Sequence, residues 1–319
     1  MEHDFRAYQS ETTDETIMEE TQTARCGSCG AEVEFEVGIH SDRCPFCASA
    51  IVVETGLNRH VKPQGQLPFL VSEETARAAL REWLGRLWFA PSDIRRQANT
   101  ERVLEGVYVP YWTYNADTRT TYRGQRGTLH QQTRRIPVLA KGKRRMRTVS
   151  STKVRWRSVR GRVSRAFQNV LVPGTKSLPR RFSDGIGPWD LSALIGYDSR
   201  YLAGFRSEAY TVPVSEAFGD AQEIMKAVIT QDIRCDIGGD RQRVVNMDTD
   251  LGRVSFKHIL LPVWIAAYRY RGTSYRFAVN GRTGIVEGQR PWSPVKIAIA
   301  IVVACILAAG VAFVFYATN

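Results

Sequence analysis

The last hydrophobic segment of the chain, residues 295–316, most constrains how the chain can fold. It reads VKIAIAIVVACILAAGVAFVFY, and its only charge is Lys296, at its edge. A helix needs about 20 consecutive apolar residues to cross a bilayer core, and inside lipid its backbone must satisfy its own hydrogen bonds. A buried core helix is the alternative, but such helices usually have a polar face and this segment has none. We therefore expect a transmembrane helix over 295–316.

The charges around this segment predict its orientation. Lys296 lies at its N-terminal edge, no basic residue follows it, and five arginines lie shortly before it: Arg269, Arg271, Arg276, Arg282 and Arg290. The positive-inside rule then places residues 1–294 in the cytoplasm and the C-terminus outside. The N-terminus has neither the basic region nor the apolar core of a signal peptide. We expect a single-pass protein that inserts through its C-terminal segment after synthesis.

Cysteines near the N-terminus form two C-x2-C pairs, Cys26 with Cys29 and Cys44 with Cys47. In a reducing cytoplasm such cysteines indicate metal binding or inert thiols rather than disulfides. Four thiolates leave no open coordination position, which is typical of a structural zinc site. We therefore predict a zinc ribbon over 25–54 with Zn²⁺ as its structural cofactor. Zinc ribbons bind proteins in many cases and nucleic acids in others, so the motif alone does not choose a partner.

The rest of the chain predicts an α+β fold that is rich in strands. Residues 1–24 are acidic and poor in large apolar side chains, so we expect a disordered arm there. Residues 55–66 are interpreted as a linker, and residues 67–290 as an α+β cytoplasmic domain. Helices are predicted from Ser72 to about residue 89 and from Ser215 to about residue 233. Alternating stretches predict strands around them, and Asn280-Gly281 predicts a last hairpin.

Two strand-like segments, 107–124 and 259–277, resemble each other. Both contain Pro-x-Trp, at Pro110/Trp112 and Pro262/Trp264, and both follow an amphipathic helix. We interpret them as two α+β halves related by pseudo-symmetry. Chance similarity between two sheet strands is the alternative, and the sequence leaves it open.

The net charge of +12 is concentrated in residues 118–183, which hold 19 Lys and Arg and no acid. Gly142 is predicted as a hairpin tip, and the basic residues proposed to bind lipid or a polyanion surround it: Lys141, Lys143, Arg144, Arg145 and Arg147. Anionic lipid, an acidic protein, nucleic acid phosphates and plain solvent are all compatible with such a segment. Because a tethered domain meets its own membrane at high effective concentration, lipid or a protein partner ranks above nucleic acid.

Several segments together resemble uncharacterised bacterial zinc-ribbon membrane proteins with a C-terminal transmembrane segment. They include the cysteine ribbon, WLGRLWFAP, GVYVPYWTYNADTRTTYRGQRG, LVPGTKSLP and LLPVWIAAYRYRGTSYRFAVNGRTGIVEGQRPWSPVKI. Such proteins are often labelled as relatives of the primosomal replication helicase because of the ribbon, and some are associated with phage-shock or SPFH membrane-stress proteins. The resemblance implies a role in a complex at the bacterial inner membrane. The central hairpin is more basic here than that resemblance implies.

Motifs of catalysis are missing from the sequence. It has no phosphate-binding G-x-x-x-x-G-K-[ST], no G-x-S-x-G and no H-E-x-x-H. We therefore expect no enzyme and infer no small-molecule substrate. The expected function is a tail-anchored adaptor or scaffold with the ribbon as a protein-docking module; a membrane-attached nucleic-acid binder is the alternative. Within the span, small residues recur at every fourth position and predict a helix-packing face: Ala300, Ala304, Ala308 and Ala312.

Overall fold

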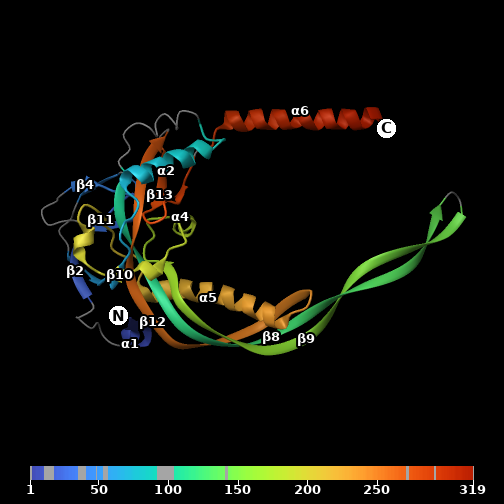
Figure 1. The fold of residues 1–319 in the computed structure, drawn as a ribbon, viewed down its shortest axis with the longest axis horizontal. Helices are drawn as coiled ribbons and strands as arrows, with labels where there is room; N and C mark the ends of the chain where they lie inside the picture. The colour runs from blue at the N-terminus through green and yellow to red at the C-terminus, as the bar shows by residue number, and fades with distance from the viewer. Residues whose placement is uncertain are drawn as a thin grey trace.

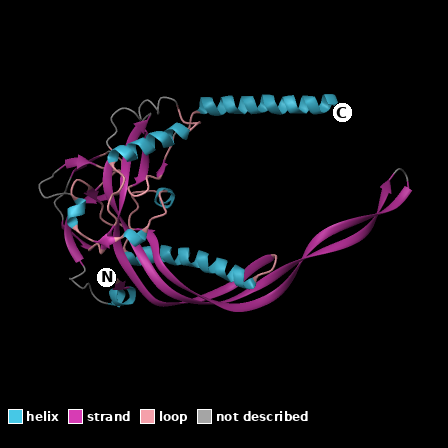
Figure 2. Cartoon of the chain, in the orientation of Figure 1, coloured by secondary structure: helices cyan, strands magenta, loops and turns pink. Residues whose placement is uncertain are grey.

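A computed structural model of the chain describes residues 2–10, 18–34, 41–47, 49–52, 57–91, 104–140, 143–270, 273–290 and 292–318. It confirms a mixed α+β architecture with a β-rich body, a cysteine cluster near the N-terminus and one apolar C-terminal helix (Figure 1). The body lies at one end of the molecule. The C-terminal helix and a long β-hairpin both extend from it toward the same side (Figure 2).

Three very long strands form the centre of the fold. They are β8 (Glu105–Ala140), β9 (Lys143–Pro173) and β12 (Arg241–Tyr270). β8 pairs antiparallel with β12 from Glu105 to Gly127 and with β9 from Tyr111 to Ala140. The sequence RVVNM and the later RVSFKHILLPVWIAAYRY predict two strands separated by turn-forming residues, but the structure has a single strand over both. The register of its pairing with β8 shifts between Val244 and Asn246 and between Leu251 and Val254. At these bulges the extra residues leave the ladder, and the pairing continues beyond them.

Shorter strands complete the nine-stranded sheet. β13 (Thr273–Asn280) and β14 (Val286–Gly288) follow β12 and form the expected last hairpin. Two short strands pair with β12: β1 (His3–Asp4) and β7 (Gly65–Gln66). β11 (Arg206–Ser207) pairs with β8, and β10 (Ile195–Gly196) pairs with β7. Separate small sheets contain β2 (Met18–Arg25), β3 (Glu32–Glu34) and β6 (Leu57–Val61), and β4 (Ser41–Arg43) with β5 (Ala50–Val52). The short helices are α1 (Phe5–Ser10), α4 (Arg180–Gly185), η2 (Leu191–Ala193) and η3 (Ser199–Leu202).

Both predicted amphipathic helices form. α2 (Glu73–Arg86) is capped by Ser72, whose hydroxyl accepts a hydrogen bond from the Thr75 backbone N–H at 3.3 Å. α5 (Val214–Ile237) begins one residue before Ser215, which therefore does not cap it. It also runs past residue 233, because Ile233 and Ile237 continue its buried stripe. α5 lies on the concave side of the curved strands (Figure 1).

The two faces of the central sheet have different covers. Even-numbered side chains at the body end of β8, such as Trp112 and Tyr114, pack under α5, and Trp264 and Ala266 of β12 pack under α2. Odd-numbered side chains of the same strands pack instead against the cysteine ribbon and α4: Val107, Val109, Tyr111, Ile259, Leu261 and Val263. The sheet is thus a middle layer between two helices and the ribbon.

The N-terminal expectations need correction. Residues 1–24, which were predicted to be disordered, contain α1, β1 and most of β2. Phe5 is buried against Tyr114 and Phe218. The composition predicted that too little apolar surface would be buried to offset the conformational entropy lost on ordering. Burial of the Phe5 side chain between other aromatic rings supplies part of that surface. The predicted linker 55–66 contains β6 and β7, and β7 lies in the main sheet. Residues 11–17 and 53–56 lie outside the described part.

The C-terminal helix α6 (Pro294–Thr318) leaves the body at its base. Residues 294–316 are long and apolar enough to cross a membrane, with a mean hydropathy of 3.0, and the body buries none of that stretch. Lys296 fastens the base to the end of α2: its Nζ donates to the carbonyl of Ala90 at 2.7 Å and to that of Trp88 at 3.3 Å. The sequence therefore correctly predicted a C-terminal helix that is long and apolar enough to cross a membrane.

The two Pro-x-Trp strands make matching contacts. The Trp112 indole donates to the carbonyl of Val212, just before α5, at 2.9 Å. The Trp264 indole donates to the carbonyl of Val71, just before α2, at 2.8 Å. Each tryptophan thus holds the start of one helix against the sheet.

Two prolines and two glycines repeat the correspondence on the backbone. The Gly174 N–H donates to Pro110 O at 2.9 Å, and the Gly281 N–H donates to Pro262 O at 2.8 Å. Each glycine carbonyl then accepts from the two residues that lead into a helix, 211 and 212 in one case and 70 and 71 in the other. The parallel strands β11 on β8 and β7 on β12 occupy matching places as well.

Candidate functional site

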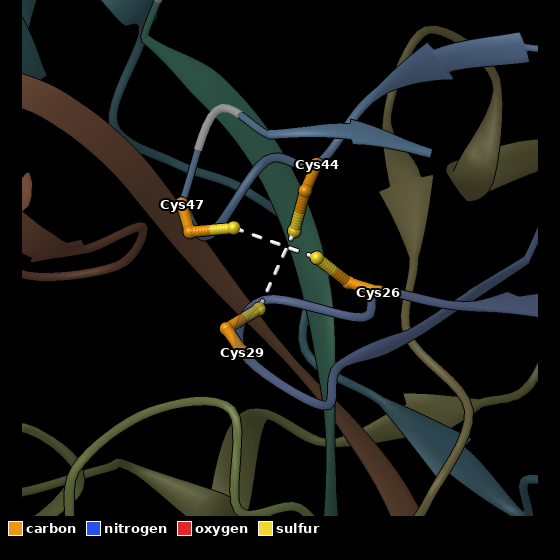
Figure 3. A group of neighbouring side chains, drawn as sticks. All are labelled: Cys26, Cys29, Cys44 and Cys47. Atoms are coloured by element: carbon orange, nitrogen blue, oxygen red, sulfur yellow. Dashed lines mark hydrogen bonds between the residues drawn. The ribbon is translucent and has the colours of Figure 1, made fainter. Parts of the chain in front are cut away.

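Four cysteines from two turns meet at one point, as the sequence predicted. Their Sγ atoms all lie within 4.8 Å of one another and point together (Figure 3). The distance from Cys26 Sγ to Cys47 Sγ is 3.5 Å, and that from Cys29 Sγ to Cys44 Sγ is 3.6 Å. These separations exceed the roughly 2.05 Å of a disulfide bond. The arrangement can therefore hold one metal ion between four sulfurs.

Local backbone geometry explains why the cysteine turns form. The Cys26 N–H donates to Ala31 O, and the Gly30 N–H donates to Cys26 O, both at 2.8 Å. Gly30 has a φ of +76°, a left-handed conformation in which glycine has no Cβ penalty. Cys44 makes the corresponding bond in the second turn, from its N–H to Ser49 O at 2.8 Å. These bonds close both turns and bring the two sulfurs of each pair toward one point.

Contacts within the cluster and burial shift the pKa values of three of its thiols in different directions. The hydrogen bond from Cys44 lowers the pKa of Cys29 to about 5, and the same contact raises the pKa of Cys44. Burial raises the pKa of the Cys26 thiol. Since thiolates are the metal-binding form, the lowered pKa of Cys29 favours metal binding.

The ribbon is not a separate module, because its inner face is part of the body core. Cys26, Ala31, Val33 and Phe46 are buried in one cluster with Val107, Val109, Ile259 and Leu261 of the central strands. Its outer turn, at Gly27 and Ser28, is exposed. The cysteine cluster therefore lies against the main sheet.

A buried carboxyl beside the ribbon is a feature that sequence reasoning missed. Glu208 forms a bridge with Val33, and its side chain is almost fully inaccessible. One carboxyl oxygen accepts from Thr175 Oγ1 at 2.7 Å, and the other has no partner among the described residues. Burial raises the pKa of Glu208 to about 8. No local signal in the SEAY stretch predicts this, because the burial comes from segments far away in sequence.

Four of the five basic residues named from the sequence lie at the far end of the β8–β9 hairpin. We call the part beyond Gly127, residues 128–140 and 143–155, the arm (Figure 1). Lys143, Arg144, Arg145 and Arg147 open β9 there, and their side chains, like all of Lys141 and Gly142, lie outside the described part. The strands pair up to Ala140 with Lys143, which fits the expected tip. The structure does not bring these residues together with the cysteines.

The alanines proposed as a packing face are at every fourth position of α6. Ala304, Ala308 and Ala312 are exposed, and no other described part of the chain covers them. A packing role for them, and for Ala300, stays a prediction.

Comparison with known proteins gives one distant similarity. The chain is 24% identical over 250 residues, 78% of its length, to an uncharacterized protein of Bacillus subtilis (strain 168), YdjG, and the match covers 70% of that protein. No family model matches the chain, and no solved structure matches it. The name of that relative assigns it no activity.

Proposed function

We propose that this protein is a tail-anchored adaptor or scaffold at the bacterial inner membrane, with the body in the cytoplasm and the C-terminus outside. In this proposal α6 fixes the molecule in the bilayer, and the body presents the arm to protein partners in a membrane complex. The role is one of binding rather than catalysis, and a membrane-stress complex is the setting that the sequence resemblance favours.

The arm is the single observation that carries the adaptor proposal. Beyond Gly127 neither β12 nor any described helix covers it, and three of its apolar side chains, Leu129, Met146 and Val149, are 43%, 63% and 39% exposed. An isolated two-stranded ribbon is marginal in water, and long strand edges are normally covered or paired. A partner surface against the arm would supply the missing cover.

Support for the anchored orientation comes from the base of α6. Arg282, Arg290 and Lys296 lie on the body side of the helix, which is the distribution found on the cytoplasmic side of membrane helices. Arg290 also stacks over Trp292, 4.3 Å from its ring centroid, where an interfacial aromatic residue is expected.

Zinc is the metal that we propose for the four cysteines. Bonds of about 2.3 Å in a tetrahedron place sulfurs about 3.8 Å apart, close to the separations observed here. All four ligands come from the protein, so the ion is structural. Because the body occupies the inner face of the ribbon, we propose that partners dock on its exposed described positions, which include the outer turn at Gly27 and Ser28.

We also infer that the body contains an internal two-fold repeat, one unit running from β7 through α2 to β8 and the other from β11 through α5 to β12. The matching tryptophan, proline and glycine contacts support it. So do two matching ring pairs: Phe69 on Trp264 and Tyr210 on Trp112 both have centroids 5.0 Å apart, at 61° and 60°. The arm is then an extension of one unit that the other lacks.

Site-specific photocrosslinking in membranes tests the adaptor proposal and locates the docking surface. A photoreactive residue replaces Ser151 on the arm, Ser28 on the ribbon turn, or Gln222 on α5 as a control. We expect defined protein adducts from Ser151 and fewer from Ser28. Adducts that are no more frequent at Ser151 and Ser28 than at Gln222 would contradict the adaptor role.

A membrane-attached nucleic-acid binder is the second candidate, and the acid-free stretch 118–183 favours it. Neutralising phosphates releases counterions, so binding would fall steeply with salt. Titration of the detergent-solubilised full chain with a 20-nucleotide DNA at several salt concentrations tests it. Absence of binding at about 100 mM salt would reject it, since non-specific binders reach micromolar affinity under such conditions.

A further inference from the structure

Arginines gather on the sheet face opposite α5. The odd-numbered side chains of β8 that face the ribbon at Val107 face solvent from Asp117 to Arg123. Arg123 lies directly opposite Arg160 of β9, and Arg162 lies opposite the neighbouring Thr121. We call Arg123, Arg160 and Arg162 the arginine row. None of the three is among the basic residues that the sequence singled out.

Like charges directly opposite one another on a sheet are destabilising. The other strand neighbour of Arg123 is Asn246, an uncharged amide, so the pair receives no carboxylate from that side. The three arginines are exposed, and no ion pair joins them to an acid among the described residues, although Asp248 lies near. The fold thus maintains a repulsive arrangement that an anion would relieve.

Arginines on the opposite face behave differently. Arg165 donates through Nε and Nη2 to the two carboxylate oxygens of Asp232 on α5, at 2.5 and 2.6 Å. Arg126 donates to the carbonyl of Ile237 at the end of the same helix. The protein therefore supplies partners for the arginines beside α5 and leaves the arginine row without them.

A shallow depression of about 710 Å³ contains the arginine row. Its lining joins the three guanidinium groups with Thr121, Tyr122, Gly161, Asn246 and Asp248. Guanidinium groups bind phosphate oxygens through paired hydrogen bonds, and an amide or hydroxyl adds further donors. We propose that the arginine row is a binding site for the phosphate of an anionic phospholipid headgroup.

The membrane anchor favours lipid over other phosphate sources. The chain carries its own membrane helix, so headgroups are present at high effective concentration. The hairpin and α6 leave the body toward the same side (Figure 2). A surface this charged does not enter hydrocarbon, so its contact is with the anionic headgroup region. This inference rests on the proposed membrane location, but a titration in detergent tests it independently of topology and of protein partners.

The test uses the full chain in a zwitterionic detergent, titrated with dioctanoyl phosphatidylglycerol and, separately, dioctanoyl phosphatidylcholine, inorganic phosphate and a 20-nucleotide DNA. The variant Arg123→Gln/Arg160→Gln removes the opposed pair. Arg77→Gln/Lys226→Gln removes the same charge from the exposed surfaces of α2 and α5. We expect phosphatidylglycerol to bind about 30-fold more weakly to the first variant, as for two charges at about 1 kcal/mol each, and almost unchanged to the second.

Loss of folding does not complicate this test, because removal of opposed like charges relieves repulsion; thermal unfolding checks that the variant is as stable as the parent. Four results would overturn the proposal: equal binding of phosphatidylglycerol and phosphatidylcholine, equal loss in both variants, unchanged binding in the first variant, or inorganic phosphate binding as tightly as the lipid. DNA binding that outcompetes the lipid and needs Arg123 and Arg160 would assign the site to nucleic acid instead.

Discussion

The two ends of the β8–β9 hairpin have the same backbone pairing but opposite environments. At the body end, Trp112 and Tyr114 are fully buried and donate hydrogen bonds to Val212 and Val214. In the arm, Leu129 and Val149 face solvent. The comparison shows that strand pairing alone extends the hairpin, whereas side-chain packing stabilises only its first half. The body end of the hairpin therefore contributes to the stability of the fold, and the arm is left free to contact a partner.

The largest effect is expected at the metal centre, which supports the body end. Structural zinc contributes about 10–16 kcal/mol of apparent binding energy in small zinc-binding peptides. Because the ribbon shares its core with Val107 and Val109, we expect chelation or Cys44→Ser to lower the melting temperature of the whole body. Thermal unfolding of the full chain in detergent measures this, with exposed Cys235→Ser as the control. A body transition unchanged by chelation would contradict the shared core.

Tryptophan substitutions compare the two ends directly. We expect Trp112→Ala to cost about 3–5 kcal/mol, because it empties a buried site and removes the bond to Val212. Trp264→Ala should cost a similar amount if the two units are repeats. Leu129→Ala in the arm should stay within about 0.5 kcal/mol. Chemical denaturation measures all three, and a Leu129→Ala cost near that of Trp112→Ala would mean that the arm is packed.

Glu208 adds a pH dependence that belongs to the body end. Its pKa is raised to about 8, so the native state holds a proton that the unfolded state loses near pH 4.5. The free energy of unfolding should therefore fall as pH rises toward 8, by about 2 kcal/mol between pH 6.5 and 8, and then level off. Glu208→Gln should flatten this slope. An equally steep slope in the variant would assign it to another group.

A smaller effect marks the boundary between the two ends. The Tyr122 hydroxyl donates to Asp236 of α5 at 2.5 Å, where the helix cover is about to end. We expect Tyr122→Phe to cost about 1.5–3 kcal/mol, as for a hydrogen bond to a charged group. Equilibrium unfolding measures it, with exposed Thr128→Val just beyond the boundary as the control. An equal loss of unfolding free energy for Tyr122→Phe and Thr128→Val would mean that packing by α5 does not end between the two positions.

Features set by neighbouring residues were predictable from the sequence. The cysteine turns, the Ser72 cap and the apolar run of α6 each depend on a few adjacent positions. Long-range features were not predictable. Phe5 orders the N-terminus only because Tyr114 and Phe218 form its pocket, and Arg123 meets Arg160 only through the register of two long strands. Composition indicated a basic surface but could not place its arginines on one face.

Cysteine labelling tests the central claim, an anchored body on the cytoplasmic side. Cys235 is an exposed native thiol on α5, and the substitution Thr318→Cys adds a thiol at the far end of α6. Intact cells that express this variant are treated with a membrane-impermeant maleimide, and lysed cells provide the reference. We predict that the thiol introduced at position 318 is labelled in intact cells and that Cys235 is labelled only after lysis. Labelling of Cys235 in intact cells would contradict the account.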